Sequence, residues 1–109
     1  LKLTEDQKIA YIYLGKDVFQ RYGATREDTE GFVNYPLAID SVEVALLFKE
    51  VSKDFFKISF RSKGRVNVAA IAGVFNGGGH YNAAGAKIKG NFISVWNRVS
   101  KVIYEQSSF

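Results

Sequence analysis

Large apolar residues occupy every second position in two neighbouring stretches near the middle of the chain, residues 42–49 and 54–62. The apolar positions are Val42, Val44, Leu46 and Phe48 in the first stretch and Phe56, Ile58 and Phe60 in the second. This period of two predicts strands with one buried face. Residues 51–54 between them are short enough for a hairpin connection. We therefore expect two adjacent antiparallel strands.

Two later stretches have the spacing of amphipathic helices, and each follows an asparagine, which is a favoured N-cap residue. The first helix is expected after Asn67, and the second is expected from Asn91 to about Glu105. Their apolar positions are Val68, Ile71, Ala72 and Phe75, then Phe92, Val95, Trp96, Val99 and Ile103. Each helix should therefore bury one stripe of side chains.

The remaining elements are predicted from shorter signals. Residues 8–14 are apolar on both faces and suit a central strand, and residues 86–89 suit a short strand ended by Gly90. Residues 16–22 suggest a short helix closed by Gly23. A helical pattern over 25–40, with Thr25 or Thr29 as the N-cap, should break or restart at Pro36. The fold class is α/β, with a mixed sheet of about five strands flanked by helices.

The composition limits the number of domains and the class of protein. The 109 residues are 47% hydrophobic and contain no repeat or linker, so residues 1–109 are expected to form a single domain. There is no apolar run of the roughly 20 residues that a membrane span needs and no signal peptide, which favours the cytoplasm. The absence of methionine suggests a piece of a longer protein, and the absence of cysteine excludes disulfides, zinc ribbons and thiol catalysis.

The charge and the glycine content point to an anionic ligand. The chain carries a net charge of +4, a mild basic surplus that domains without anionic partners also show. Gly77, Gly78 and Gly79 stand before the single histidine, His80, and such a loop could cradle a phosphate with its backbone amides. The alternative is a flexible helix C-cap and turn. The segment is neither a Walker A loop nor a Rossmann motif, because its glycines follow a helix.

Other candidate ligand contacts each have a structural alternative. Arg61 could hold a phosphate through two hydrogen bonds, or it could be solvated at the end of a strand. Ser62 could donate a hydrogen bond to the ligand, or its hydroxyl could stabilise a turn. Asn34 could contact a ligand, or its side-chain amide could serve the end of a helix. Tyr81 could stack on a base, or it could pack in the core or on the surface of the protein. One histidine without a thiol or a carboxylate cluster makes a metal site within this chain improbable. No catalytic triad or paired carboxylates can be assembled.

Several of these segments together resemble a known family. They are Phe60-Arg61-Ser62, the helix from Asn67-Val68, Gly77 to His80, and Asn82-Ala83-Ala84-Gly85-Ala86. In this order they resemble the C-terminal, DHH-associated domain of DHH-family phosphoesterases. Glu30 to Tyr35, Val42 to Ala45 and Leu47 to Glu50 resemble its subgroup of nanoRNases and 3′-phosphoadenosine 5′-phosphate (pAp) phosphatases, with their cyclic-dinucleotide phosphodiesterase relatives. The likeness spans about Ile9 to Tyr104.

The resemblance implies a substrate-binding domain of a longer enzyme, whose N-terminal DHH domain holds two manganese ions that activate water. Arg61 and Ser62 would grip the phosphate or the terminal nucleotide, and the amides of Gly77, Gly78 and Gly79 would line the cleft. His80 would reach the scissile phosphate as the catalytic residue of this chain. Asn82, Ala83 and Ala84 would shape the wall beside the nucleotide. The chain departs from the family in lacking Asp-His-His and in placing Pro36 after Asn34-Tyr35.

The expected activity of the parent protein is therefore hydrolysis of short oligoribonucleotides or pAp. Its partners would be the substrate and the DHH domain of the same polypeptide, within a parent that can be a homodimer. The alternatives are a phosphodiesterase for cyclic di-AMP or a related dinucleotide, a stand-alone nucleic-acid-binding module, and an association domain that uses the strand from Val42 to Phe48. The isolated chain is expected to bind no metal and to be inactive.

Overall fold

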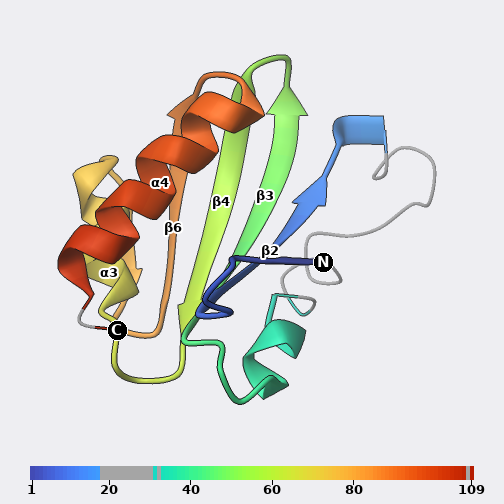
Figure 1. Ribbon diagram of the computed structural model, residues 1–109. Helices are drawn as coiled ribbons and strands as arrows, with labels where there is room; N and C mark the ends of the chain where they lie inside the picture. Colours follow the sequence, from blue (N-terminus) through green and yellow to red (C-terminus); the bar gives the residue numbers. More distant parts are fainter. Residues whose placement is uncertain (18–30, 32, 108) are drawn as a thin grey trace.

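In the part of the chain that the structure describes, a six-stranded mixed sheet carries two helices on one face (Figure 1). The structure, a computed structural model, describes residues 1–17, 31, 33–107 and 109. The elements are β1 (Lys2–Leu3), β2 (Ile9–Leu14), the 3₁₀ helix η1 (Tyr35–Ala38), β3 (Val44–Ser52), β4 (Phe55–Ser62), α3 (Val68–Val74), β5 (Gly78–His80), β6 (Ala83–Lys89) and α4 (Phe92–Gln106). The strand order is β1-β2-β3-β4-β6-β5, which confirms the predicted α/β class.

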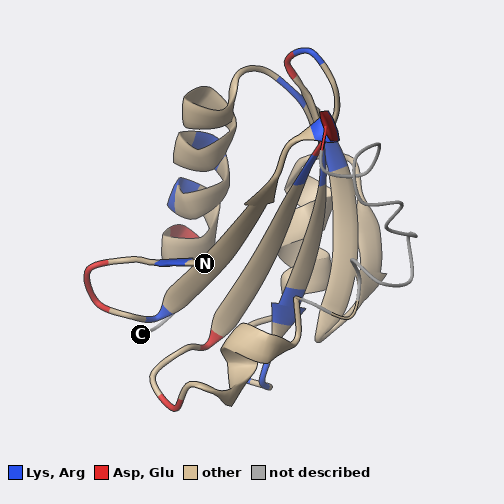
Figure 2. Cartoon of the chain, turned by 90° about the vertical axis from the view of Figure 1, so that its right-hand side faces the viewer, with Lys and Arg blue, Asp and Glu red and all other residues tan. Residues whose placement is uncertain are grey.

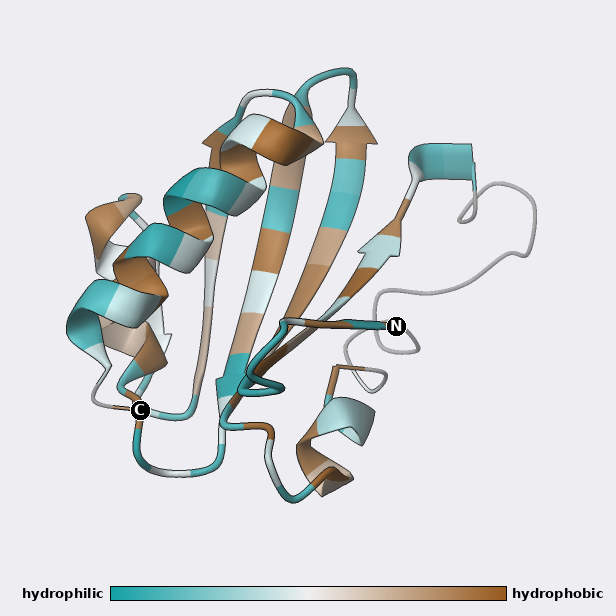
Figure 3. Cartoon of the chain, in the orientation of Figure 1, coloured by the Kyte–Doolittle hydropathy of each residue, from teal (hydrophilic) through white to brown (hydrophobic). Residues whose placement is uncertain are grey.

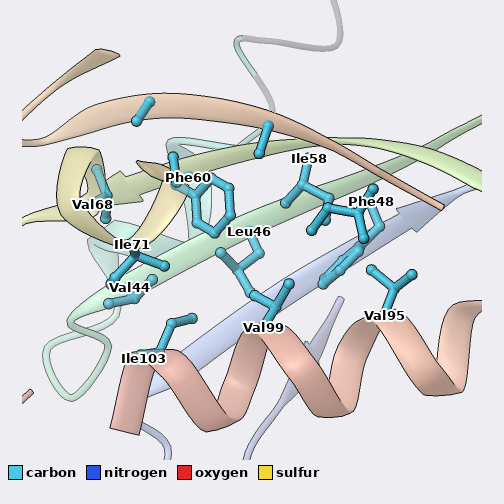
Figure 4. Close-up of a cluster of buried hydrophobic side chains, with 14 of the residues drawn as sticks. Val44, Leu46, Phe48, Ile58, Phe60, Val68, Ile71, Val95, Val99 and Ile103 are labelled. Atoms are coloured by element: carbon cyan, nitrogen blue, oxygen red, sulfur yellow. The ribbon is translucent and has the colours of Figure 1, made fainter. Parts of the chain in front are cut away.

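The main core lies between the sheet and helices α3 and α4, whose apolar side chains point toward those of β3 and β4 (Figure 4). The alternating residues of the two strands are buried, and so are Val95, Val99 and Ile103 of α4. The predicted stripe of α4 is visible as bands of apolar residues along the helix (Figure 3). Phe92 and Trp96 complete this stripe as half-buried residues packed against the core.

Both helices begin where their asparagines predict. The Asn67 side chain accepts a hydrogen bond from the Ala70 amide at 3.2 Å, and the Asn91 side chain accepts one from the Ser94 amide at 2.9 Å. Each bond satisfies one of the amides that a helix leaves unpaired at its start. The N-cap predictions are therefore confirmed.

Some predicted boundaries were wrong. β3 begins at Val44, two residues later than expected, and β6 extends from Ala83 rather than from residue 86. β2 is not central, because it lies second from the edge and pairs with β3 in parallel. Pro36 lies in the first turn of η1, which confirms a helix start there. Most of the helix predicted for 16–22 with its closing Gly23, and the caps Thr25 and Thr29, lie outside the described residues.

The opposite face of the sheet is divided into two parts. Over β2 and β3 it carries a small apolar cluster of Val33, Ala45 and Leu47, packed against by Ile12, Leu14 and Leu37. Residues 44–48 of β3 are thus buried on both faces, so the stretch from Val42 to Phe48 does not present the apolar surface that one of our sequence-based alternatives requires. Over β4, β5 and β6 the same face carries small and charged residues. Among the described residues, no helix is long and apolar enough to span a membrane.

Candidate functional site

The strand register brings Arg61 and His80 onto one face of the sheet. Arg61 of β4 pairs with Ala83 of β6, and Ala83 pairs with His80 of β5. Directly opposed residues point to the same face, and neighbouring strands lie about 4.8 Å apart. The two basic side chains therefore start about 10 Å apart, with a single methyl group between them. That separation leaves room for a phosphate group.

The next row of residues deepens this gap into a hollow. Ser59, Gly85 and Gly78 are paired across the same three strands, and two of them have no side chain. A hollow of ≈ 360 Å³ results, lined by Lys57, Ser59, Arg61, Gly78, Gly79, Ala83, Ala84 and Gly85. We call it the first hollow. His80, which is exposed, stands at its rim on the edge strand.

The glycine segment is not the loop that we expected. It begins as a helix C-cap, in which Asn76 has a φ of 62° and the Gly77 amide donates to the Ala72 carbonyl at 2.8 Å. This bond and the one from the Asn76 amide to the Gly73 carbonyl form a Schellman motif. Gly78 to His80 then form the edge strand β5. The Gly77 amide is thus used by the helix and is not offered to a ligand.

The three glycines have different reasons to lack a side chain. A Cβ on Gly77 would lie 2.1 Å from the Gly85 carbonyl oxygen, and one on Gly79 would lie 2.6 Å from that of Ala83. Gly79 also has a φ of +149°, which L residues rarely adopt. A Cβ on Gly78 would meet no atom of the described chain within 4 Å. Packing therefore requires Gly77 and Gly79, whereas Gly78 keeps the first hollow open.

Ser62 and Asn82 hold the corner beside this site together. The buried Ser62 hydroxyl donates to the Val66 carbonyl at 2.7 Å and accepts from the Asn82 side-chain amide at 2.9 Å. The Ser62 amide donates to the Asn82 carbonyl, and the Val68 amide donates to the Tyr81 carbonyl. These bonds fix the end of β4, the start of α3 and the β5–β6 turn relative to one another. The hydroxyl proton of Ser62 is thereby directed away from a ligand.

Replacing Ser62 by Ala should therefore lower stability rather than remove a ligand contact. The change leaves the Val66 carbonyl and the Asn82 amide without their partner, which should cost about 2 kcal/mol of unfolding free energy. Urea denaturation followed by circular dichroism would measure the loss. Ser107→Ala is the control, because the Ser107 hydroxyl has no hydrogen-bond partner within the described structure. Equal stability of both variants with the wild type would contradict this role for Ser62.

The other predicted site residues lie at different distances from the first hollow. Arg61 is half-buried, and its guanidinium donates to the Phe60 carbonyl at 2.9 Å. Tyr81 and Asn82 are exposed in the β5–β6 turn next to His80. Asn34 stands before η1 without a side-chain capping bond and is not among the residues that line the hollow. The structure therefore groups Arg61, Gly78, Gly79, His80, Ala83 and Ala84, but not Asn34.

Sequence reasoning missed Lys57, Ser59 and Gly85 as lining residues. Lys57 and Ser59 share the face of Arg61 through the period of two along β4, which was a usable signal. Lys57 also pairs with Lys49 on one side and Lys87 on the other. Three lysines thus lie in a row across β3, β4 and β6. Basic segments lie on neighbouring strands toward the hairpin end of the sheet (Figure 2), and this row attracts anions.

The described residues do not suit a metal centre. Over residues 1–17, 31, 33–107 and 109, no three His, Cys, Asp or Glu side chains are grouped so that they could hold an ion. The first hollow contains basic and hydroxyl groups instead, and these bind anions.

The family follows from comparison with known proteins. The family model described as "DHHA1 domain" matches residues 6–105. This chain belongs to the DHHA1 domain family. The match confirms the resemblance drawn from Arg61, Gly77 to His80 and the Ala-Gly-Ala segment.

Curated relatives of this DHHA1 domain are described as bifunctional oligoribonuclease and PAP phosphatase NrnA. The protein from Bacillus subtilis is 33% identical over 79 residues, which cover 72% of this chain and 25% of the relative. The protein from Thermus thermophilus is 32% identical over 81 residues, which cover 73% of this chain and 25% of the relative. The chain thus spans about a quarter of the length of the curated relatives it matches.

Solved structures show the same DHHA1 fold. An exopolyphosphatase-related protein from Bacteroides fragilis superposes with a TM-score of 0.83 at 32% identity, over 95% of this chain and 31% of that chain. The C-Ala domain of Aquifex aeolicus alanyl-tRNA synthetase superposes with a TM-score of 0.63 at 11% identity, over 87% of this chain and 89% of that chain. The latter likeness concerns the fold alone.

Proposed function

We propose that this DHHA1 domain binds the substrate of a manganese-dependent phosphoesterase that hydrolyses short oligoribonucleotides and pAp in the cytoplasm. A DHH domain of the same polypeptide would hold the metal ions, so the chain alone would bind nucleotides without cleaving them. The relatives described as oligoribonuclease and PAP phosphatase support this activity. The role of this chain is to bind and orient the phosphate that is to be cleaved.

The observation that carries the proposal is the first hollow, an open cleft floored by glycine and alanine between Arg61 and His80. Arg61 presents a planar, permanently charged group that suits two phosphate oxygens. His80 can donate to a phosphate oxygen in either of its protonation states. Since the floor lacks bulky side chains, a phosphodiester can approach the sheet closely. Both donors can then reach it from opposite sides.

Filling the floor should weaken binding without disturbing the fold. Gly78→Val places a branched side chain in the first hollow, where a Cβ has free space. Because this side chain occupies the space that the ligand needs, pAp binding should weaken about tenfold or more. We would follow the backbone amides by NMR while titrating pAp or 5′-phosphorylated diadenylate without metal. In the wild type we expect shifts at Arg61, Gly78 and His80.

The control is Gly73→Val on the exposed surface of α3, where an added Cβ likewise meets no described atom within 4 Å. It should bind as the wild type does. In the full-length gene product, Arg61→Ala and His80→Ala should each lower kcat/KM for diadenylate and pAp. Unchanged hydrolysis by both variants would overturn the site assignment. Faster turnover of cyclic di-AMP than of diadenylate or pAp by the wild-type protein would replace the proposed substrate class.

A further inference from the structure

The histidine at the rim of the first hollow stands on the weakest strand of the sheet. β5 has three residues, two of which are glycine, and all three are exposed. It pairs with β6 alone and forms the edge of the sheet. Glycine has no side chain to pack, and it loses more conformational freedom on ordering than any other residue. The pairing of β5 with β6 therefore does little by itself to hold His80 in place.

The turn after His80 does not have the conformation that usually fixes a short hairpin. His80 pairs with Ala83, so only Tyr81 and Asn82 connect the two strands. Two-residue hairpin loops favour type I′ or II′ turns, which require a positive φ at one or both central residues. Neither Tyr81 nor Asn82 has a positive φ, and the unprimed turn types splay the strands apart. The position of His80 therefore depends on contacts outside the hairpin.

Three hydrogen bonds from the turn to neighbouring elements supply these contacts. The Tyr81 carbonyl accepts from the Val68 amide at 2.8 Å, and the Asn82 carbonyl accepts from the Ser62 amide at 3.0 Å. The third bond, from the Asn82 side-chain amide to the Ser62 hydroxyl at 2.9 Å, depends on the identity of the side chain. We call this third bond the turn clamp. Its acceptor is itself fixed, because the Ser62 hydroxyl is buried and donates to the Val66 carbonyl.

We propose that Asn82 is a positioning residue that acts through His80. The turn clamp ties the residue two places after His80 to Ser62, which directly follows Arg61 on β4. It thereby links the two basic groups on either side of the first hollow and sets the distance between them. The inference rests on the proposed function, because this distance matters only if both groups bind one phosphate. Asn82 needs no contact with the ligand, in contrast to the wall residue that the family resemblance implies.

A double-mutant cycle tests whether Asn82 acts through His80. We would titrate the chain with pAp without metal and follow the backbone amides by NMR. Asn82→Ala should weaken binding about threefold, because the loosened turn lets His80 leave the position in which it reaches the phosphate. In the His80→Ala background, the same change should alter the affinity less than about 1.5-fold, since the group through which it acts is gone.

The mobility of His80 gives a second readout, which needs no ligand. The ¹⁵N heteronuclear NOE of the His80 amide should fall in Asn82→Ala, because the turn gains fast motion, whereas the values along β3 and α4 should stay the same. The turn clamp is only half-buried. The melting temperature should therefore fall by no more than about 6 °C, so a general loss of structure does not account for the change at His80.

The matched control is Asn97→Ala, which makes the same change at an exposed position on α4. It should bind pAp and leave the His80 NOE as in the wild type. Two results would overturn the positioning role and leave the proposed function standing: an equal loss of affinity from Asn82→Ala in both backgrounds, or an unchanged His80 NOE. If His80→Ala itself left pAp binding unchanged, the proposed site would be wrong, and the positioning role would fall with it.

Discussion

Gly77→Ala should destabilise the domain by about 3 kcal/mol, the upper end of the usual range for overpacking. The added carbon would lie 2.1 Å from the Gly85 carbonyl oxygen and 2.8 Å from the Ala86 Cα. Both are backbone atoms of β6, so no side-chain rotation relieves the clash. The C-cap of α3 or the β5–β6 pairing must shift instead. For a domain of this size the melting temperature should fall by about 12 °C, as measured by circular dichroism.

Gly78→Ala is the matched control, since it makes the same chemical change one residue later. Its Cβ has open space, and the melting temperature should stay within about 2 °C of the wild type. A similar loss for both variants would mean that neither Gly77 nor Gly78 tolerates a side chain. The distinction between a packing glycine and a site glycine would then be wrong.

Phe48→Ala should have a still larger effect, about 4 kcal/mol of unfolding free energy. Phe48 is fully buried on β3, and its ring lies edge-on to those of Tyr11 and Phe92, with centroids 5.9 and 5.1 Å apart. Its removal leaves a cavity under α4 as well as lost aromatic contacts. Urea denaturation at constant pH would measure the loss.

Ile93→Ala provides the comparison on α4 itself. Ile93 is 71% exposed, so its truncation should change stability by less than about 0.5 kcal/mol. A loss below 1.5 kcal/mol for Phe48→Ala would contradict the central position of this ring in the core.

The elements with strong local signals were predictable from the sequence. Asn67 and Asn91 start their helices because an asparagine side chain can accept from an amide three residues later, and this information is contained in adjacent residues. The period of two in β3 and β4 is likewise local. The parallel pairing of β2 with β3 could not be predicted, because no property of Ile9 alone selects Val44 as its partner.

The glycine- and alanine-rich strands were the main failure. Glycine and alanine have low strand propensity, so β5 was interpreted as a loop and β6 was predicted too short. β6 pairs with the edge of β4, and β5 then pairs with the free edge of β6. The family resemblance identified the segment around His80 as a site. It could not show that Ser62 and Gly77 are engaged in structure, since their partners, Asn82 and Gly85, come from other elements.

The pairing of β2 with β3 also bears on the order in which the chain folds. Ile9 and Val44 are 35 positions apart in the sequence, whereas β3, β4, α3, β5, β6 and α4 follow one another without a break longer than a few residues. Closing a long loop costs entropy before its contacts form. We therefore expect the segment from Val44 to Gln106, which contains the first hollow, to collapse first. The amino-terminal strands would then add to its exposed edge and be the first to open.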